Sequence, residues 1–73
     1  SSAASDVYKR QLLYVHMNRN RTLEEISRAL RVDTGKTLTR LASLERLGLI
    51  ESKGIHGLKG FTTTALAMRY LNQ

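Results

Sequence analysis

The chain has 73 residues, enough for one small domain with a single core. It has no cysteine, which excludes disulfides and thiolate metal sites, and no run of about 18 apolar residues that could cross a membrane. Twelve Lys and Arg residues against six Asp and Glu give a formal net charge of +6, which predicts a polyanionic partner such as nucleic acid or an acidic surface.

The first eleven residues are treated separately from the rest. Their sequence, SSAASDVYKRQ, resembles over its whole length the in-frame translation of a transposase adapter used in DNA sequencing libraries. We therefore expect residues 1–11 to be a non-native leader and residues 12–73 to form the domain. Without the leader, ten basic and five acidic residues remain, so the predicted partner class is unchanged. We find no signal-peptide pattern and expect a cytoplasmic protein.

Two helices are predicted in the first part of the domain. Residues 12–18 carry apolar side chains without a breaker and indicate the end of a first helix, and a polar break follows over 18–21. Thr22-Leu23-Glu24-Glu25 has the pattern of a capping box, in which the Thr22 hydroxyl accepts from the Glu25 amide and the Glu25 carboxylate reaches back. The second helix is predicted from there to near Leu30.

A short turn leads to a third helix. Residues 31–33 are too few for a linker, and Asp33 is a good N-cap for a helix over about 34–47. Gly48 is suited to the left-handed position that ends it. Two helices joined by a turn of three or four residues form a helix-turn-helix unit, whose second helix enters the DNA major groove.

The third helix is expected to be amphipathic, at about 100° per residue. Its apolar arc is predicted to comprise Thr37, Leu38, Leu41, Ala42, Leu44 and Leu47. Its polar arc comprises Lys36, Thr39, Arg40, Ser43 and Arg46, with no acid among them. Cations reach phosphates or guanine edges, and hydroxyls pass close to bases. If Arg40 reads a base, Arg40→Ala should weaken binding by about 1–3 kcal/mol. The alternative is an ordinary solvated face, which normally mixes signs.

A basic wing is predicted after the third helix. The expected elements are a strand over 49–53, a loop over 54–60, a return strand over 61–63 and a last helix capped by Thr64. Lys53, His56 and Lys59 lie on this wing, at about 52–60, and would contact the DNA backbone or minor groove. A mobile surface loop is the alternative for this segment.

These segments resemble winged transcription regulators of the IclR and MarR types. Residues 22–30 look like their second helix, and Lys36-Thr37-Leu38-Thr39-Arg40-Leu41 with Leu44 and residues 47–51 resembles their recognition helix and first wing strand. Residues 59–64, followed by Leu66 and Tyr70-Leu71, are similar to the strand and linking helix that IclR-type proteins place after the wing. The resemblance covers about 12–71. Gly35 and Thr37 depart from the pattern, which usually has a better helix former and an apolar residue there.

The resemblance implies a mainly α fold with a small β-hairpin, and DNA binding as a homodimer or as part of a larger regulator. By position it implies groove contacts from Lys36, Thr39, Arg40 and Ser43. A separate region would sense a ligand or dimerise.

Catalytic chemistry finds little support in the sequence. Gly35-Lys36-Thr37 resembles the end of a phosphate-binding loop, but Leu30 stands where that motif needs a glycine. The two histidines, His16 and His56, are far apart in sequence. No serine lies in a nucleophile elbow. We expect no enzyme activity, no catalytic residue, no cofactor and no metal site.

The predicted function is therefore sequence-specific binding of double-stranded DNA for transcription regulation, by a three-helix core with a two-stranded wing and a C-terminal helix. The candidate DNA contacts are Thr34, Lys36, Thr39, Arg40, Ser43, Arg46, Lys53, His56 and Lys59. The main alternative is a winged-helix protein-interaction module of a larger assembly, which would expose an apolar patch on the third helix. RNA binding is a third, weaker possibility.

Overall fold

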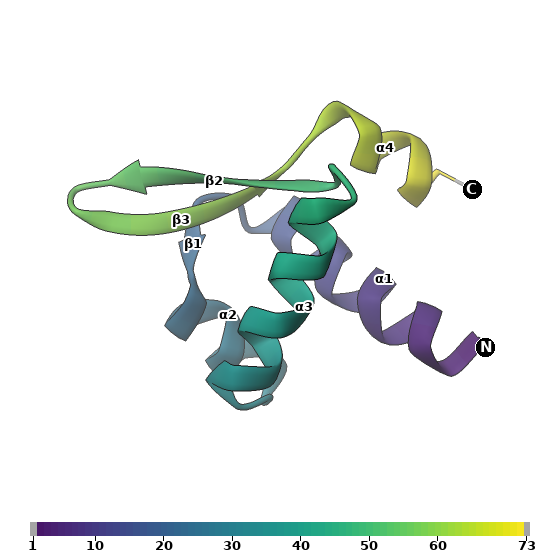
Figure 1. The fold of residues 1–73 in the computed structure, drawn as a ribbon, viewed down its shortest axis with the longest axis horizontal. Helices are drawn as coiled ribbons and strands as arrows, with labels where there is room; N and C mark the ends of the chain where they lie inside the picture. Colours follow the sequence, from purple (N-terminus) through teal and green to yellow (C-terminus); the bar gives the residue numbers. More distant parts are fainter. Residues whose placement is uncertain (1, 73) are drawn as a thin grey trace.

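A helix-turn-helix unit lies beneath a long β-hairpin in the computed structural model, which describes residues 2–72 (Figure 1). In chain order the elements are α1 (Ser2–Met17), β1 (Arg21–Thr22), α2 (Leu23–Leu30), α3 (Thr34–Arg46), β2 (Ile50–Ile55), β3 (Leu58–Thr63) and α4 (Ala65–Leu71). The predicted fold class, a winged helix-turn-helix, is confirmed. No helix in the described part of the chain is long and apolar enough to span a membrane.

The start of α2 is the predicted capping box. The Thr22 amide donates to Glu25 Oε1 at 3.0 Å, and the Glu25 amide donates to Thr22 Oγ1 at 3.3 Å. The Thr22 hydroxyl also donates to Glu25 Oε1, at 3.1 Å. The two hydrogen bonds from Thr22 to this carboxylate, with an Arg21–Glu25 ion pair of 3.5 Å, hold the pKa of the Glu25 carboxyl below its ordinary value. Arg31 ends α2 in a left-handed conformation, with φ of 57°.

Helix α3 begins and ends within one residue of the prediction. The Asp33 carboxylate accepts from the Lys36 amide at 2.9 Å, which satisfies one of the free donors of the first turn. The last helical residue is Arg46, and Leu47 is the C-cap. Gly48 follows with φ of +80°, a conformation that costs a glycine little.

The sheet is larger than the sequence predicts. Its order is β1-β3-β2, all antiparallel, so β3 is the central strand. Strand β1 lies in what we predicted to be a polar break, and it pairs with β3 through Arg21 and Phe61. This short strand joins the wing to the helix-turn-helix unit, because Thr22 is both a strand residue and the N-cap of α2.

The predicted loop over 54–60 is wrong, because most of it is strand. Strand β2 continues to Ile55 and β3 begins at Leu58, so the turn consists of His56 and Gly57 alone. Both have positive φ, 50° and 80°, as in the two-residue turns whose twist matches a β-hairpin. The other two glycines of the segment, Gly54 and Gly60, lie in strands and pair with Lys59 and Lys53.

The core is formed by the inner faces of the helices and one face of the sheet. Its buried apolar side chains are Leu12, Val15, Ile26, Leu30, Leu41, Leu44, Leu49, Ile50, Phe61 and Ala67. Thr64 precedes α4, but its hydroxyl donates to the Gly48 carbonyl rather than capping the helix. The prediction of a Thr64 side-chain cap is therefore wrong.

Helix α1 includes residues that we expect to be a leader. It continues without a break from Ser2 through Met17. Gln11 is buried and its Nε2 donates to the Thr37 carbonyl at 3.3 Å, while Tyr8 packs against the core. The non-native origin of residues 1–11 stays a prediction.

Candidate nucleic-acid interface

A narrow stripe of buried side chains packs α3 against the core, and most of the helix surface is exposed to solvent. Thr37, Leu41 and Leu44 are buried, at the helical spacing i, i+4 and i+7. The Thr37 hydroxyl, which replaces the expected apolar residue, donates to the Asp33 carbonyl at 2.9 Å. The remaining side chains of the helix form one broad outward surface with two flanks, one toward α1 and one toward the wing.

The apolar arc predicted from the sequence is too wide. Leu38 is 49% exposed and Leu47 is 65% exposed, and Ala42 is exposed as well. None of the three therefore belongs to the core. Leu38 and Ala42 lie on the outward surface, whereas Leu47, the C-cap, lines a separate hollow with Leu49, Leu66 and Tyr70. Spacing alone does not separate the buried group from the exposed one, because Leu38, Leu41 and Ala42 also lie at a helical spacing of i, i+3 and i+4.

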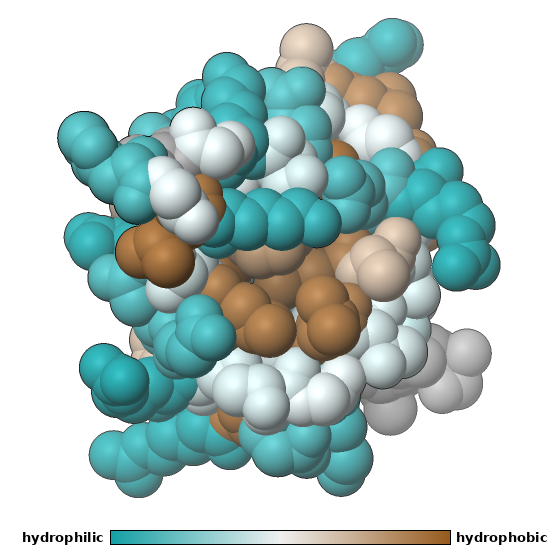
Figure 2. Space-filling view, turned by 60° about the vertical axis from the view of Figure 1, so that its left-hand side comes forward, coloured by the Kyte–Doolittle hydropathy of each residue, from teal (hydrophilic) through white to brown (hydrophobic). Residues whose placement is uncertain are grey.

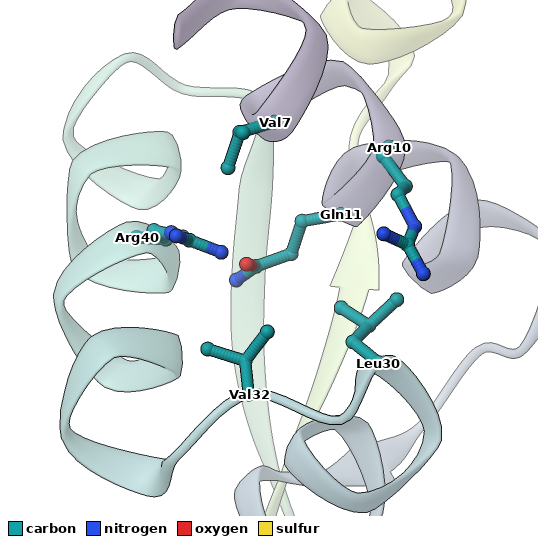
Figure 3. Close-up of a pocket in the computed structure, with 6 residues that line it drawn as sticks. All are labelled: Val7, Arg10, Gln11, Leu30, Val32 and Arg40. Atoms are coloured by element: carbon teal, nitrogen blue, oxygen red, sulfur yellow. The ribbon is translucent and has the colours of Figure 1, made fainter.

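The flank of α3 toward α1 carries cations. Lys36 and Arg40 line a hollow at the start of the helix together with Tyr8, Asp33, Gly35 and Thr39. Arg40 is half-buried, and its side chain extends from α3 toward Gln11 of α1 at a small cavity of about 60 Å³ (Figure 3). The guanidinium thus lies at the edge of the outward surface rather than at its centre.

The flank of α3 toward the wing is apolar. Leu38 faces a groove of about 270 Å³ between α2, α3 and the hairpin, lined also by Thr22, Leu23, Glu24, Gly57, Leu58, Lys59 and Phe61. Figure 2, in which the wing side comes forward, shows apolar side chains gathered in a hollow and surrounded mainly by hydrophilic ones. Leu38 and Leu58 were not predicted as surface residues of this region.

The middle and end of α3 carry polar side chains. Thr34, Thr39 and Arg46 are exposed, and Ser43 is half-buried. Glu45, the acid of this helix, accepts a hydrogen bond from Ser52 of β2 at 3.2 Å, which directs its carboxylate toward the hairpin. Among the described residues, Lys36, Arg40 and Arg46 form no ion pair with a carboxylate. Their charges are therefore available to an anionic partner.

The hairpin holds the remaining candidates at its exposed end. His56 forms the turn, and Lys59 follows with its ammonium 5.6 Å from the centre of the Phe61 ring. Lys53 pairs with Glu51 at 3.7 Å, and both side chains are more than half exposed. Lys59 also lines the groove beside Leu38, so the wing and α3 contribute to one continuous surface.

The structure brings together two groups of the predicted contacts. Lys36, Thr39 and Arg40 share one hollow, and Lys59 shares a groove with α3. Within residues 2–72, no three His, Asp or Glu side chains are grouped so that they could hold a metal ion.

Comparisons with known proteins identify the fold. No protein-family profile and no curated protein sequence matches the chain. Among solved structures, it is similar to MarR with a TM-score of 0.83 and 21% identity over 92% of the chain. It is also similar to Streptococcus pneumoniae FabT in complex with DNA, with a TM-score of 0.82 and 20% identity, and to the S. aureus MepR–DNA complex, with 0.81 and 22%, each over 89% of the chain.

These matches confirm the predicted resemblance at the level of the winged-helix fold. The chain spans about half of each matched protein, 48% of MarR and of FabT and 50% of MepR.

Proposed function

We propose that this chain is the DNA-binding module of a transcription regulator, with no catalytic activity of its own. Helix α3 enters the major groove of double-stranded DNA, and the hairpin β2–β3 contacts the backbone beside it. Two of the proteins with the same fold were solved as complexes with DNA, which supports this proposal.

One observation carries the proposal: the outward surface of α3 has three cations without carboxylate partners among the described residues, and its acid is turned toward the hairpin. Phosphate contacts from such cations release counterions and provide affinity without sequence information. Thr34, Thr39 and Ser43 lie between or beside them with short hydroxyl side chains. Side chains of this length let the helix approach the base edges.

The two flanks of the surface have different proposed roles. Lys36 and Arg40 contact phosphates on the α1 side, because Arg40 lies at the edge of the surface. Lys59 contacts the backbone on the opposite side, with His56 at the tip and Lys53 behind it. Arg46, in the last turn of α3, contacts the groove or its edge.

We also propose that the module acts as a homodimer or within a longer regulator. A two-fold dimer would place two copies of α3 about one helical turn of DNA apart, on half-sites related by symmetry. The region that dimerises or senses a ligand would lie outside the surface described above.

A salt titration tests the proposed function. The dissociation constant for mixed-sequence 20–30 base-pair duplexes is measured by fluorescence anisotropy from low to moderate ionic strength. We expect log K to fall linearly with log salt, with a slope of about −0.9 for each phosphate contacted. The triple variant Lys36→Ala, Arg40→Ala, Lys59→Ala should reduce that slope by two to three units. Absence of binding even at low ionic strength would refute the proposal.

A protein-interaction module is the second candidate function, and the exposure of Leu38 and Ala42 favours it. An apolar patch on this helix is the feature expected of such a module. Binding that does not weaken with salt, or that occurs with a protein partner and not with duplex DNA, would favour this candidate.

A further inference from the structure

Leu38 is the residue of the outward surface that the proposed function leaves unexplained. It is 49% exposed on a helix whose neighbouring surface is formed by cations and hydroxyls. Ala42 lies one turn further along the same flank and is also exposed. A half-exposed leucine on a DNA-facing helix covers a base edge without offering it a hydrogen bond, because its side chain has no donor or acceptor. The lost hydrogen bonds to water are then not replaced. Such a leucine would therefore be expected to have an apolar partner.

The major groove offers one apolar group. Each base pair there presents hydrogen-bond donors and acceptors, and thymine alone adds a methyl group, at C5. We infer that Leu38, supported by Ala42, makes this module select thymine through its C5 methyl group. This inference rests on the proposed function, because it requires α3 to lie in the groove.

The surroundings of Leu38 fit a base edge better than a phosphate. Leu23 and Phe61 form apolar walls of the adjoining groove, and Glu24 lies at its lining. The apolar walls disfavour a phosphate inside this groove. Lys59 across the groove and Lys36 on the other flank would hold the two backbones on either side. The major-groove edge of the bases would then lie over the segment around Leu38.

The apolar part of this surface, which favours the second candidate function by its exposure, is nevertheless small for a stable protein interface. Its strongly exposed apolar side chains are Leu38 and Leu58, the latter 62% exposed. A stable protein interface buries about 800 Å² on each partner around a desolvated apolar centre. Two leucines with lysine beside them are far from that requirement. RNA is also a poor partner, because uracil lacks the methyl group and the deep, narrow major groove of A-form RNA excludes side chains.

The test replaces thymine with deoxyuridine, which removes the methyl group and keeps every hydrogen-bonding atom. Duplexes are first selected from a random library containing thymine. Each thymine of the selected sequence is then replaced singly, and affinity is measured by fluorescence anisotropy. We expect at least one position at which the wild-type protein loses about fourfold in affinity, which corresponds to about 0.8 kcal/mol for one buried methyl group.

Two variants complete the test. In Leu38→Ala the loss at that position should fall below twofold, and in Leu47→Ala, which removes an exposed leucine at the end of the same helix, it should stay near fourfold. Circular dichroism verifies that both variants are folded. Equal affinity of the wild-type protein for thymine and deoxyuridine at every position would overturn the inference alone. So would a fourfold loss that persists in Leu38→Ala. Failure to bind any duplex would instead overturn the proposed function as well.

Discussion

The two flanks of α3 differ in chemistry although they belong to one helix of 13 residues. The flank toward α1 has Lys36 and Arg40, whereas the flank toward the wing has Leu38 and Ala42. A charge attracts every DNA sequence alike, but a methyl-sized apolar contact distinguishes one base from the others. Under the proposed function, affinity and selectivity are therefore divided between opposite sides of one helix.

The comparison also separates exposure from hydrophobicity. Leu38 and Leu41 are three positions apart, and they differ in exposure from 49% to 0%. Leu41 packs in the core cluster, whereas Leu38 faces the groove beside the wing. Chemically identical side chains therefore serve stability in one case and, under the proposed function, recognition in the other.

The largest expected effect is the difference in stability between two variants, in which one or the other of these leucines is replaced by alanine. Leu41→Ala should lower the free energy of unfolding by about 2–5 kcal/mol, because it opens a cavity in a small core. Leu38→Ala should change it by less than about 0.5 kcal/mol. Urea unfolding followed by circular dichroism measures both. A large loss in Leu38→Ala would mean that this side chain supports the fold, and the division between the flanks would fail.

Arg40→Ala tests the charged flank. If Arg40 contacts a phosphate, affinity falls for all sequences alike and the salt slope decreases by about one unit. Arg69→Ala, which removes an exposed cation of α4, is the matched control and should leave DNA binding unchanged. A loss of about 1–3 kcal/mol confined to particular sequences would instead assign Arg40 to base reading, as the sequence pattern alone suggests.

Glu51→Gln tests the wing from the opposite direction. Glu51 pairs with Lys53 at 3.7 Å in an exposed position, so its removal frees the ammonium and deletes a negative charge beside the proposed backbone contact. We expect affinity to rise by about twofold at low salt and the gain to vanish at high salt, in keeping with the small energies of exposed ion pairs. Lys59→Ala should act in the opposite sense. An unchanged affinity in both variants would remove the wing from the interface.

The smallest expected effect is on the pH dependence of stability and comes from the capping box. It does not involve DNA binding. Hydrogen bonds from Thr22 and the charge of Arg21 lower the pKa of Glu25 in the folded state. The stability they provide is therefore present above the unfolded-state pKa and is lost as the pH falls through the lowered folded-state value. Glu25→Gln should remove this part of the acid dependence. Thermal unfolding of both proteins at several pH values from neutral to acidic measures it, and parallel curves would contradict the assignment.

The sequence predicted the parts of the fold that depend on local signals. The capping box at Thr22, the Asp33 cap and the left-handed Gly48 all involve residues close together in sequence, and each is present. The length of the hairpin could not be predicted as well. Gly54 and Gly60 indicate a loop by composition, but their pairing with Lys59 and Lys53 is a property of the assembled sheet.

The sequence predicted which kinds of residues form the candidate site, but not how they are arranged in space. Cations on α3 and on the wing could be read from the sequence, and the structure brings Lys36, Thr39 and Arg40 to one hollow. Arg40 lies at the edge of the outward surface because of how α1 packs against α3. That packing involves residues far apart in the sequence and could not be predicted from local patterns. Leu38 was assigned to the core because hydrophobicity alone cannot tell a buried residue from one that faces a groove.

The turn at His56 and Gly57 restricts how the wing can change length in related chains. Because both strands remain paired up to this turn, one extra residue on either side would move every following side chain to the opposite face of the ribbon. Additions of two residues to each strand at once would preserve both the pairing and the face of each side chain, and would extend the ribbon by about 3.3 Å per added pair. Wings of this kind should therefore vary in length by multiples of four residues, and each step would carry the tip further from α3.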